Sequence, residues 1–263
     1  MSDPRAERLA AMRAQIAAFE AGGRSRSGVL PFGAPAVDCC LPGGGLPLGR
    51  WHEILGQGME VETSAAPTAF AALMAVPLAR RGEAVWVLRR DDLFAPGLVG
   101  LGFPSDRLIQ VCARDEAEAL AVMEDALATL GVTAVFAEVE AVGLTAGRRL
   151  QLACEKLGAT GFVIRRRPYG GQARREASGS AAATRWNVLP APSETPAGEF
   201  GLGPPRYRVE LERCRGGRTG SWLFEAAGAY SLEARDGTHP LRLVADVGDR
   251  QLAPAQPFRR TAA

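Results

Sequence analysis

The chain of 263 residues has almost no lysine, little histidine and no long apolar run. Its single lysine is Lys156, and arginine supplies the rest of its 31 basic side chains. Two histidines and five cysteines, none of them in a C-x-x-C pair, exclude the common zinc-binding patterns. No apolar stretch approaches the roughly 20 residues that span a bilayer, and the charged N-terminus is unlike a secretory signal. We therefore expect a cytoplasmic protein without a metal centre or membrane contact.

The composition is that of a soluble globular protein, with 47% apolar and 23% charged residues. The length is sufficient for one large domain with a substantial core. Runs with helical and strand periodicity alternate along the chain, which predicts an α/β fold. Most cysteines lie inside apolar runs, so we expect buried, reduced thiols at Cys39, Cys40, Cys112, Cys154 and Cys214.

A Gly-rich stretch between an apolar strand and a helix is the most informative part of the sequence. The strand ends near Gly56, and a helical pattern follows at 67–82, with Pro67 in its first turn and Gly82 closing it. This order is the setting of a phosphate-binding loop, whose chemistry requires a lysine and a hydroxyl. The stretch has no lysine, and its two acidic side chains would repel phosphate. Its residues of interest are Gly56, Gly58, Glu60, Glu62 and Thr63.

Residues 1–23 predict a helix that opens with a capping side chain followed by Pro4. Apolar side chains at spacings of three or four residues form a narrow seam of heptad type, and they are Leu9, Met12, Ile16 and Phe19. Residues 24–29 follow as a flexible connector. A helix with so narrow a seam must pack on something. It either folds back on its own domain or docks on a neighbouring subunit.

Four apolar runs in the middle of the chain predict buried strands, at 85–88, 108–112, 134–139 and 161–165. Helical patterns separate them at 116–130 and at 146–157. The first of these helices has an apolar face formed by Leu120, Met123, Leu127 and Leu130. Strands separated by helices of this length predict βαβ units and a mostly parallel sheet.

The following residues, 166–183, are rich in Gly, Ser, Ala and Arg, which predicts a long mobile loop. Alternating patterns then predict strands at 184–192, 206–214 and 221–226, with a hairpin turn at 215–218. The core domain is expected to span 30–254 and to be followed by a frayed tail at 255–263.

Positive charge is concentrated in this half, since residues 165–218 hold eleven arginines against five acidic side chains. Arginine neutralises backbone phosphate, and Tyr or Trp can stack on an unpaired base. A solvated loop and a site for an acidic protein are the alternatives. The candidate side chains for binding DNA or another anion are Arg165, Arg166, Arg167, Tyr169, Arg174, Arg175, Arg185 and Trp186.

Neither of the more conspicuous residue types in the strands indicates catalysis. His52 is expected to be a satisfied structural residue, because no nucleophile and acid accompany it. Trp51, Trp86, Trp186 and Trp222 are most simply expected in or near the core.

Three segments resemble a known family: RLAAMRAQIAAFE at 8–20, LPFGAPAVDCCLPGGGLPLGRWHEILG at 30–56 and ATRWNVLPAPS at 183–193. They resemble the RecA recombinase core and, more closely, the ImuA family of bacterial damage-inducible mutagenesis proteins. The similarity runs from the N-terminal helix to about Glu225. It implies a RecA-like, P-loop-type core with a mostly parallel twisted sheet flanked by helices. It also implies antiparallel C-terminal strands and an N-terminal docking helix.

Matched to this resemblance, the nucleotide site has departed from the family pattern at four places. The lysine and hydroxyl of the RecA loop fall within 60–65, and the water-activating glutamate falls near Asp91. The magnesium-directing aspartate falls on Glu138, and the glutamine that senses the γ-phosphate falls among Arg165 and Arg166. The resemblance therefore implies a vestigial site that has no cofactor and does not hydrolyse ATP. Weak phosphate binding by backbone amides at the helix N-terminus stays open.

The resemblance further implies a non-catalytic accessory factor in the SOS response to DNA damage, acting in error-prone translesion synthesis. Its implied partners are RecA, an ImuB-like homologue of Y-family polymerases and an error-prone C-family polymerase, ImuC. Single-stranded DNA is a further candidate partner. Two other classes stay open: a divergent RecA-type, DNA-dependent ATPase and a regulator that binds single-stranded DNA.

Overall fold

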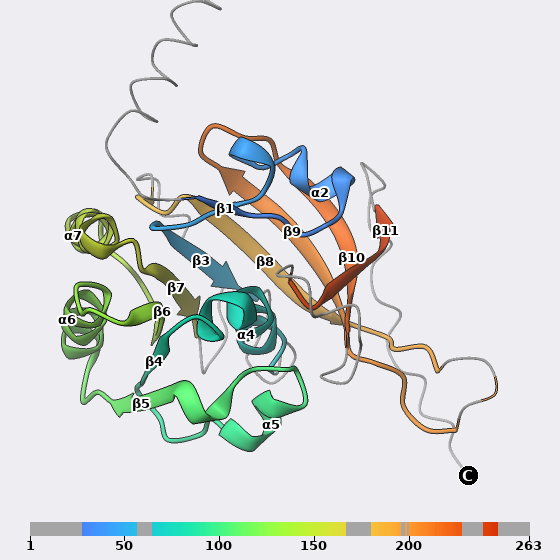
Figure 1. The fold of residues 1–263 in the computed structure, drawn as a ribbon, viewed down its shortest axis with the longest axis horizontal. Coiled ribbons are helices and arrows are strands. Elements are labelled where there is room, and N and C mark those ends of the chain that lie inside the picture. Colours follow the sequence, from blue (N-terminus) through green and yellow to red (C-terminus); the bar gives the residue numbers. More distant parts are fainter. Residues whose placement is uncertain are drawn as a thin grey trace, which may run out of the picture.

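The computed structural model describes residues 28–56, 65–166, 180–195, 198, 200–227 and 239–246. These residues form one nine-stranded mixed sheet with helices on both faces (Figure 1). The predicted N-terminal helix, with Leu9, Met12, Ile16 and Phe19, lies outside the described residues, as does the predicted tail. Among the described residues, no helix has the length and apolar character needed to cross a membrane.

The described helices and 3-10 turns are α2 (Pro35–Asp38), η1 (Pro42–Gly44), α4 (Ala66–Ala79), α5 (Ala95–Val99), η2 (Ser105–Arg107), α6 (Glu116–Leu127) and α7 (Leu144–Leu157). The strands are β1 (Val29–Leu30), β2 (Leu46–Pro47), β3 (Trp51–Leu55), β4 (Glu83–Leu88), β5 (Leu108–Cys112), β6 (Val132–Val139), β7 (Thr160–Arg165), β8 (Thr184–Ala191), β9 (Arg206–Cys214), β10 (Gly220–Ala226) and β11 (Leu241–Asp246).

The large sheet has the strand order β11-β10-β9-β8-β3-β7-β6-β4-β5. Neighbours from β5 to β8 pair in parallel, whereas β8, β9, β10 and β11 pair antiparallel. The predicted α/β class, parallel sheet and antiparallel C-terminal strands are confirmed. The predicted hairpin joins β9 to β10, and Gly216 in its turn has φ 72°. Strand β11 and the β1–β2 pair were not predicted.

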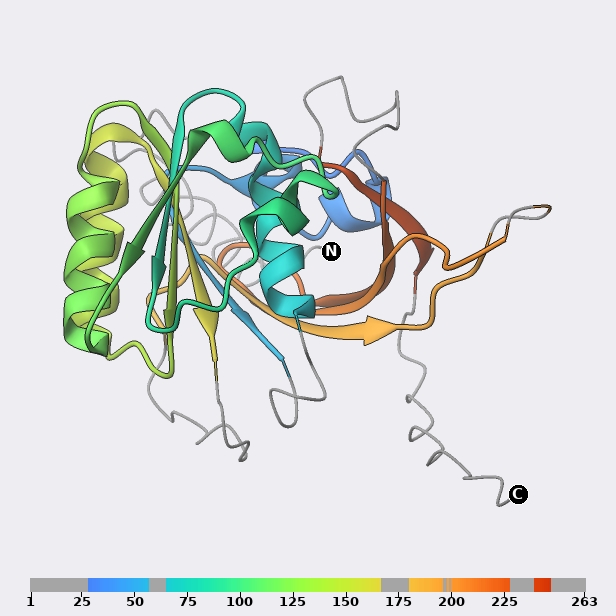
Figure 2. The same ribbon diagram turned by 90° about the horizontal axis from the view of Figure 1, so that it is seen from below.

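The hydrophobic core has two parts, one on each face of the sheet. Helix α4 lies at the centre of one part, and the sheet curves around it (Figure 2). Nearly all its residues are buried, because the sheet covers one side and the α2 region packs into the same cluster. Pro67 lies in its first turn as predicted, but the helix ends at Ala79. Gly82 therefore does not close it. A Cβ at Gly82 would lie 2.5 Å from the carbonyl oxygen of Gly131, so the close approach of these two backbone segments requires glycine at position 82.

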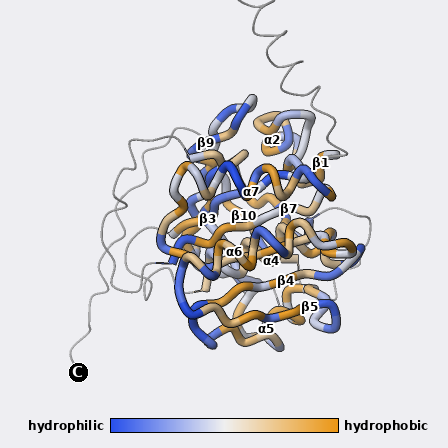
Figure 3. The backbone as a smooth tube through the Cα atoms, turned by 90° about the vertical axis from the view of Figure 1, so that its left-hand side faces the viewer, coloured by the Kyte–Doolittle hydropathy of each residue, from blue (hydrophilic) through white to orange (hydrophobic). Residues whose placement is uncertain are grey.

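Helices α6 and α7 cover the opposite face of the sheet (Figure 1). Figure 3 shows hydrophobic and hydrophilic stretches alternating along both helices. Met123 and Leu127 of α6 are buried as predicted, and Leu120 packs against them. Leu130 is 88% exposed, because α6 ends at Leu127. The prediction that Leu130 shares the apolar face is therefore wrong.

Strand β5 forms one edge of the sheet and is not the buried strand that its apolar sequence predicts. Ile109 is 47% exposed and Cys112 is exposed as well. A buried strand and an edge strand have the same local sequence pattern, so the pattern could not separate them. The cysteine prediction is wrong in the same way for Cys39, which is also exposed, whereas Cys154 is buried. All five cysteines are free thiols.

The start of the described chain is fixed by Asp38, a residue within the 30–56 segment of the family resemblance. Its carboxylate accepts backbone hydrogen bonds from Phe32 (2.7 Å) and Ala34 (3.2 Å). The ring of Phe32 then packs 5.8 Å from the rings of Trp186 and Phe224. Asp38 thus ties the segment before α2 to the core.

Candidate functional site

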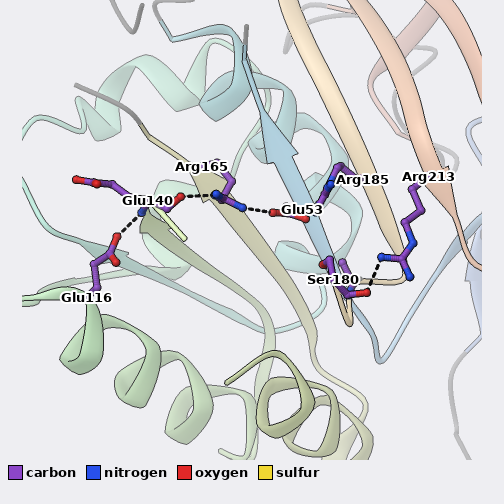
Figure 4. Close-up of polar contacts among 8 residues, drawn as sticks. Glu53, Glu116, Glu140, Arg165, Ser180, Arg185 and Arg213 are labelled. Carbon is purple, nitrogen blue, oxygen red and sulfur yellow. Dashed lines mark hydrogen bonds and ion pairs between the residues drawn. The ribbon is translucent and has the colours of Figure 1, made fainter. Parts of the chain in front are cut away.

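A buried carboxylate, Glu53, lies in the middle of β3 and contacts two arginines from the strands on either side. Its side chain is 1% exposed. Oε1 accepts a hydrogen bond of 2.6 Å from Nη1 of Arg165 on β7, and Oε2 accepts one of 2.8 Å from Nε of Arg185 on β8. Figure 4 shows both guanidinium groups turned toward Glu53. We call these three residues the Glu53 cluster.

The sheet register explains why these residues meet. Strand β3 lies between β7 and β8, and Glu53 is level with Arg185 and with Val163. Arg165, two residues beyond Val163, therefore points to the same face of the sheet. A buried carboxylate is costly unless it is paired and hydrogen-bonded, and here each oxygen has its own cationic donor. The Glu53 cluster consequently links three adjacent strands.

Further polar contacts lie on either side of this cluster (Figure 4). Arg165 also donates from Nε to the carbonyl oxygen of Glu140, and the backbone N–H of Glu140 donates to Glu116. On the other side, Arg213 of β9 donates to the carbonyl oxygen of Ser180 at 2.6 Å. Burial and the neighbouring Arg215 and Arg185 lower the pKa of Arg213 from its ordinary value.

A second buried carboxylate, Glu138, lies near the end of β6 and is 3% exposed. Its Oε1 accepts a hydrogen bond from the indole N–H of Trp86 at 3.1 Å, and its Oε2 accepts one from Arg166 at 2.7 Å. Arg166 also contacts both carboxylate oxygens of Asp92, at 2.8 and 2.9 Å. These four residues form the Glu138 cluster, in which one guanidinium lies between two carboxylates.

The pKa values of the two carboxylates in the Glu138 cluster are shifted in opposite directions. Burial raises the pKa of Glu138, and the hydrogen bond and charge of Arg166 oppose that shift. The hydrogen bond from Arg166 lowers the pKa of Asp92, which is far more exposed. Near neutral pH Arg166 is charged. Its guanidinium therefore supplies the positive charge that this pair of carboxylates requires.

The two clusters lie on opposite faces of the sheet. Glu53 alternates with Ile54 and shares its face with Trp51, which belongs to the core under α6 and α7. Glu138 shares its face with Phe136, which belongs to the core around α4. The family resemblance placed the vestigial nucleotide site on α4 and its preceding loop, so only the Glu138 cluster is on the face where that site is expected.

Several of the predicted site residues can be compared with this geometry. Glu138 and Arg166 do meet, but the acidic partner is Asp92, whereas the resemblance pointed to Asp91, which is exposed. Gly56 follows β3 directly. The remaining loop residues, Gly58, Glu60, Glu62 and Thr63, lie outside the described residues. Within the described part of the chain, no group of three or more His, Cys, Asp or Glu side chains could hold a metal ion.

The structure describes only some of the predicted anion-binding residues. The guanidinium groups of Arg165, Arg166 and Arg185 contact protein carboxylates. Arg167, Tyr169, Arg174 and Arg175 lie outside the described residues. The end of the predicted mobile loop, 180–183, is buried, and the N–H of Ala183 donates to the carbonyl oxygen of Trp51.

Trp186 is fully buried, which overturns its predicted role in stacking on a base. Its ring packs 5.8 Å from Phe32 and 6.0 Å from Phe70, and its indole N–H donates to Thr184. The simpler prediction, that the four tryptophans lie in the core, is confirmed, since each is at most 1% exposed. A ring enclosed in this way has no face to offer a ligand.

His52 is a structural residue, as predicted. Its ring nitrogens lie 2.7 Å from the hydroxyl of Thr184 and 2.9 Å from the carbonyl oxygen of Pro47. Burial lowers its pKa to about 4, so the ring is neutral at physiological pH. The sequence carries a comparable signal for Glu53, because a charged residue within the apolar strand WHEIL requires a partner.

Comparison with known proteins adds two findings. No family model matches the chain. It is 58% identical over 247 residues to a curated protein named ImuA from two strains of Caulobacter vibrioides, and the match covers 92% of this chain and 99% of each relative.

Proposed function

This chain belongs to the ImuA family, and on that premise we propose that it is a non-catalytic accessory factor in DNA-damage-induced, error-prone translesion synthesis. It acts in the cytoplasm through contacts with RecA, with an ImuB-like homologue of Y-family polymerases and with a C-family polymerase of the ImuC type. Family membership supports the process and the polymerase-type partners. The contact with RecA and the absence of ATPase activity rest on the residues described next.

The observation that carries the non-catalytic part is the position of Arg166 between Asp92 and Glu138. Magnesium in a nucleotide site is held by carboxylates together with the phosphates of the substrate. Here a permanent positive charge already contacts both carboxylates, and a divalent cation would be repelled by it or would have to displace it. Displacement would leave the buried Glu138 without its guanidinium partner. The absence of lysine from residues 56–64 supports the same proposal.

The contact with RecA is assigned to the N-terminal seam of Leu9, Met12, Ile16 and Phe19. The segment resembles the RecA helix that packs on the adjacent protomer, so its apolar side chains would contact the same surface of a RecA filament. Pulldown with purified RecA tests this assignment. The triple variant Leu9→Asp, Ile16→Asp, Phe19→Asp should lose binding, and Gln15→Asp, outside the seam, should retain it. Undiminished binding by the triple variant would contradict the contact.

An ATPase assay tests the non-catalytic part. Purified protein with ATP, magnesium and single-stranded DNA should release phosphate no faster than a protein-free reaction. DNA-stimulated turnover that disappears in the double variant Asp92→Ala, Glu138→Ala would instead establish a divergent ATPase. Asp106→Ala, an exposed acidic residue on η2, is the matched control and should leave any activity unchanged.

A further inference from the structure

Three of the five cysteines lie where the end of α2 meets the hairpin between β9 and β10. Cys39 and Cys40 follow α2 directly, and Cys214 is the last residue of β9. The other two, Cys112 and Cys154, lie on β5 and α7. A pair of thiols can be oxidised to a disulfide only where the fold brings two separate segments close together. The junction of α2 with the hairpin is such a place.

The turn of the hairpin brings Cys40 and Cys214 to the same point. A Cβ at Gly217 would lie 2.3 Å from the carbonyl oxygen of Cys40 and 2.6 Å from Sγ of Cys214, so both cysteines border this glycine. The backbone N–H of Arg218 donates to the carbonyl oxygen of Cys40 at 2.8 Å. Because residue 217 has no side chain, the α2 segment approaches the hairpin closely and Cys40 lies beside Cys214.

The surroundings of the two thiols differ from those of an exposed cysteine. Both side chains are partly buried and pack against the hydrophobic core around α4. Burial and then the neighbouring Cys40 raise the pKa of the Cys214 thiol to about 11. Cys214 is therefore protonated near neutral pH. Since the thiolate is the nucleophile in thiol oxidation, the attacking residue of the pair is Cys40.

We propose that Cys40 and Cys214 form a reversible disulfide when the protein meets hydrogen peroxide. The Cys40 thiolate attacks one peroxide oxygen and the O–O bond breaks, which leaves a sulfenic acid on Cys40 and releases hydroxide. The hydroxide takes up the proton that Cys40 lost and becomes water. The Cys214 sulfur then displaces the sulfenic oxygen, which leaves with the Cys214 proton as a second water. The two thiols have lost two electrons, and one peroxide has gained them.

The disulfide would tie the α2 segment to the antiparallel half of the sheet. It goes beyond the proposed function and does not depend on it. Disulfides in cytosolic proteins are usually transient and redox-sensing, and a dithiol reductant returns this one to its two thiols. A covalent link between segments so far apart in the sequence also restricts the unfolded chain. The oxidised protein should therefore melt at a higher temperature than the reduced protein.

Peptide mapping of the full chain after treatment with hydrogen peroxide tests the proposal. Free thiols are blocked, and the chain is cleaved after glutamate without reduction. Cys40 then lies in peptide 21–53 and Cys214 in peptide 213–225. Mass spectrometry should find the two peptides linked, and dithiothreitol should separate them. Cys40→Ser should abolish the link, whereas Cys39→Ser, the matched control at the adjacent position, should retain it.

A second measurement covers the stability of the link. The rise in melting temperature on oxidation should be absent from Cys214→Ser and present in Cys112→Ser, which removes an exposed thiol on β5. Circular dichroism of the reduced variants should match that of the unaltered protein, because serine is close to cysteine in size. An equal rise in Cys214→Ser would contradict the proposal.

Three other outcomes would overturn the proposal. A link that survives Cys40→Ser and is lost in Cys39→Ser would assign the bond to the wrong neighbour. Absence of linked peptides at a peroxide concentration that converts Cys112 to a sulfenic acid would exclude the disulfide. A link found only in a dimer band on a non-reducing gel would place the bond between two molecules.

Discussion

Glu53 on β3 and Glu138 on β6 are both buried carboxylates on parallel strands separated by β7, yet their surroundings give them different roles. Each oxygen of Glu53 has a guanidinium partner, and those partners come from the two adjacent strands. Glu138 has one indole N–H and one guanidinium, and it shares that guanidinium with Asp92 near the surface. A buried carboxylate with a guanidinium group on each oxygen thus links adjacent strands of the sheet. A buried carboxylate that shares its guanidinium group with a second carboxylate requires that one positive charge.

Removal of Glu53 should have the largest effect on stability. Glu53→Ala leaves Arg165, whose side chain is 8% exposed, and Arg185 without their carboxylate, and breaking a buried pair costs about 3–5 kcal/mol. Urea denaturation followed by circular dichroism measures the loss. Glu155→Ala is the control, because it removes a half-exposed partner of Arg50 and should cost less than about 1 kcal/mol. Equal losses for the two variants would show that burial of Glu53 is energetically irrelevant.

Arg166→Met should have the next largest effect, about 2 kcal/mol at pH 7, because Arg166 is partly exposed and its contribution is screened. Burial raises the pKa of Glu138, and loss of Arg166 raises it further. A raised carboxyl pKa favours the folded state at low pH and disfavours it as pH rises through that pKa. The cost of Arg166→Met should therefore shrink as pH falls toward 4.5, the ordinary pKa of a glutamate side chain.

Denaturation midpoints at several pH values measure this trend. Arg149→Met, which removes an exposed partner of Glu124, is the control and should show no such pH dependence. A cost that is constant between pH 7 and pH 4.5 would mean that Glu138 is not the group left uncompensated.

Trp86→Phe tests the neutral donor of the Glu138 cluster and should cost about 1–2 kcal/mol. The ring stack on Phe136, at 4.0 Å between centroids, can be kept by phenylalanine, but the hydrogen bond to Glu138 cannot. A double-mutant cycle with Glu138→Leu isolates the contribution of the hydrogen bond, and thermal unfolding measures the stability of each variant in the cycle. If the cost of Trp86→Phe is the same in both backgrounds, the indole N–H contributes nothing to Glu138.

Asp92→Asn should have the smallest effect, below about 1 kcal/mol, because Asp92 is 44% exposed. Arg166 lowers the pKa of Asp92, so the contribution of Asp92 to stability is present above pH 3.8, the ordinary pKa of an aspartate side chain, and is lost as pH falls through the pKa of the folded state. The difference in stability between the original protein and the variant should therefore vanish in acid. Denaturation at pH 7 and pH 3 measures it, and a difference that grows in acid would contradict the assignment.

Local patterns in the sequence predicted the secondary structure that depends on neighbouring residues. The apolar runs at 85–88, 134–139 and 161–165 became buried strands, and the helices between them made those strands parallel. Pro67 in the first turn of α4 and the turn at 215–218 were also read correctly, because they depend on a few adjacent residues.

Contacts between distant residues were not predictable in the same way. Glu53 meets Arg165 and Arg185 across 112 and 132 residues, so only the strand order brings them together. The exposure of Ile109 depends on β5 being the last strand at its end of the described sheet, which the sequence of β5 does not encode. The choice of Asp92 over Asp91 depends on where the chain turns after β4, a matter of one residue that a family resemblance cannot resolve.

Arg165 precedes and Arg185 follows the stretch that runs from β7 to β8, and both are fastened to the one carboxylate of Glu53. The two ends of that stretch are therefore held together by ion pairs to one side chain. A change in the number of residues at 167–179, between Arg166 and the buried residues 180–183, alters the entropy of closing the segment, which grows slowly with length, and leaves the paired ends in place. This part of the sequence can therefore lengthen or shorten without rebuilding the sheet.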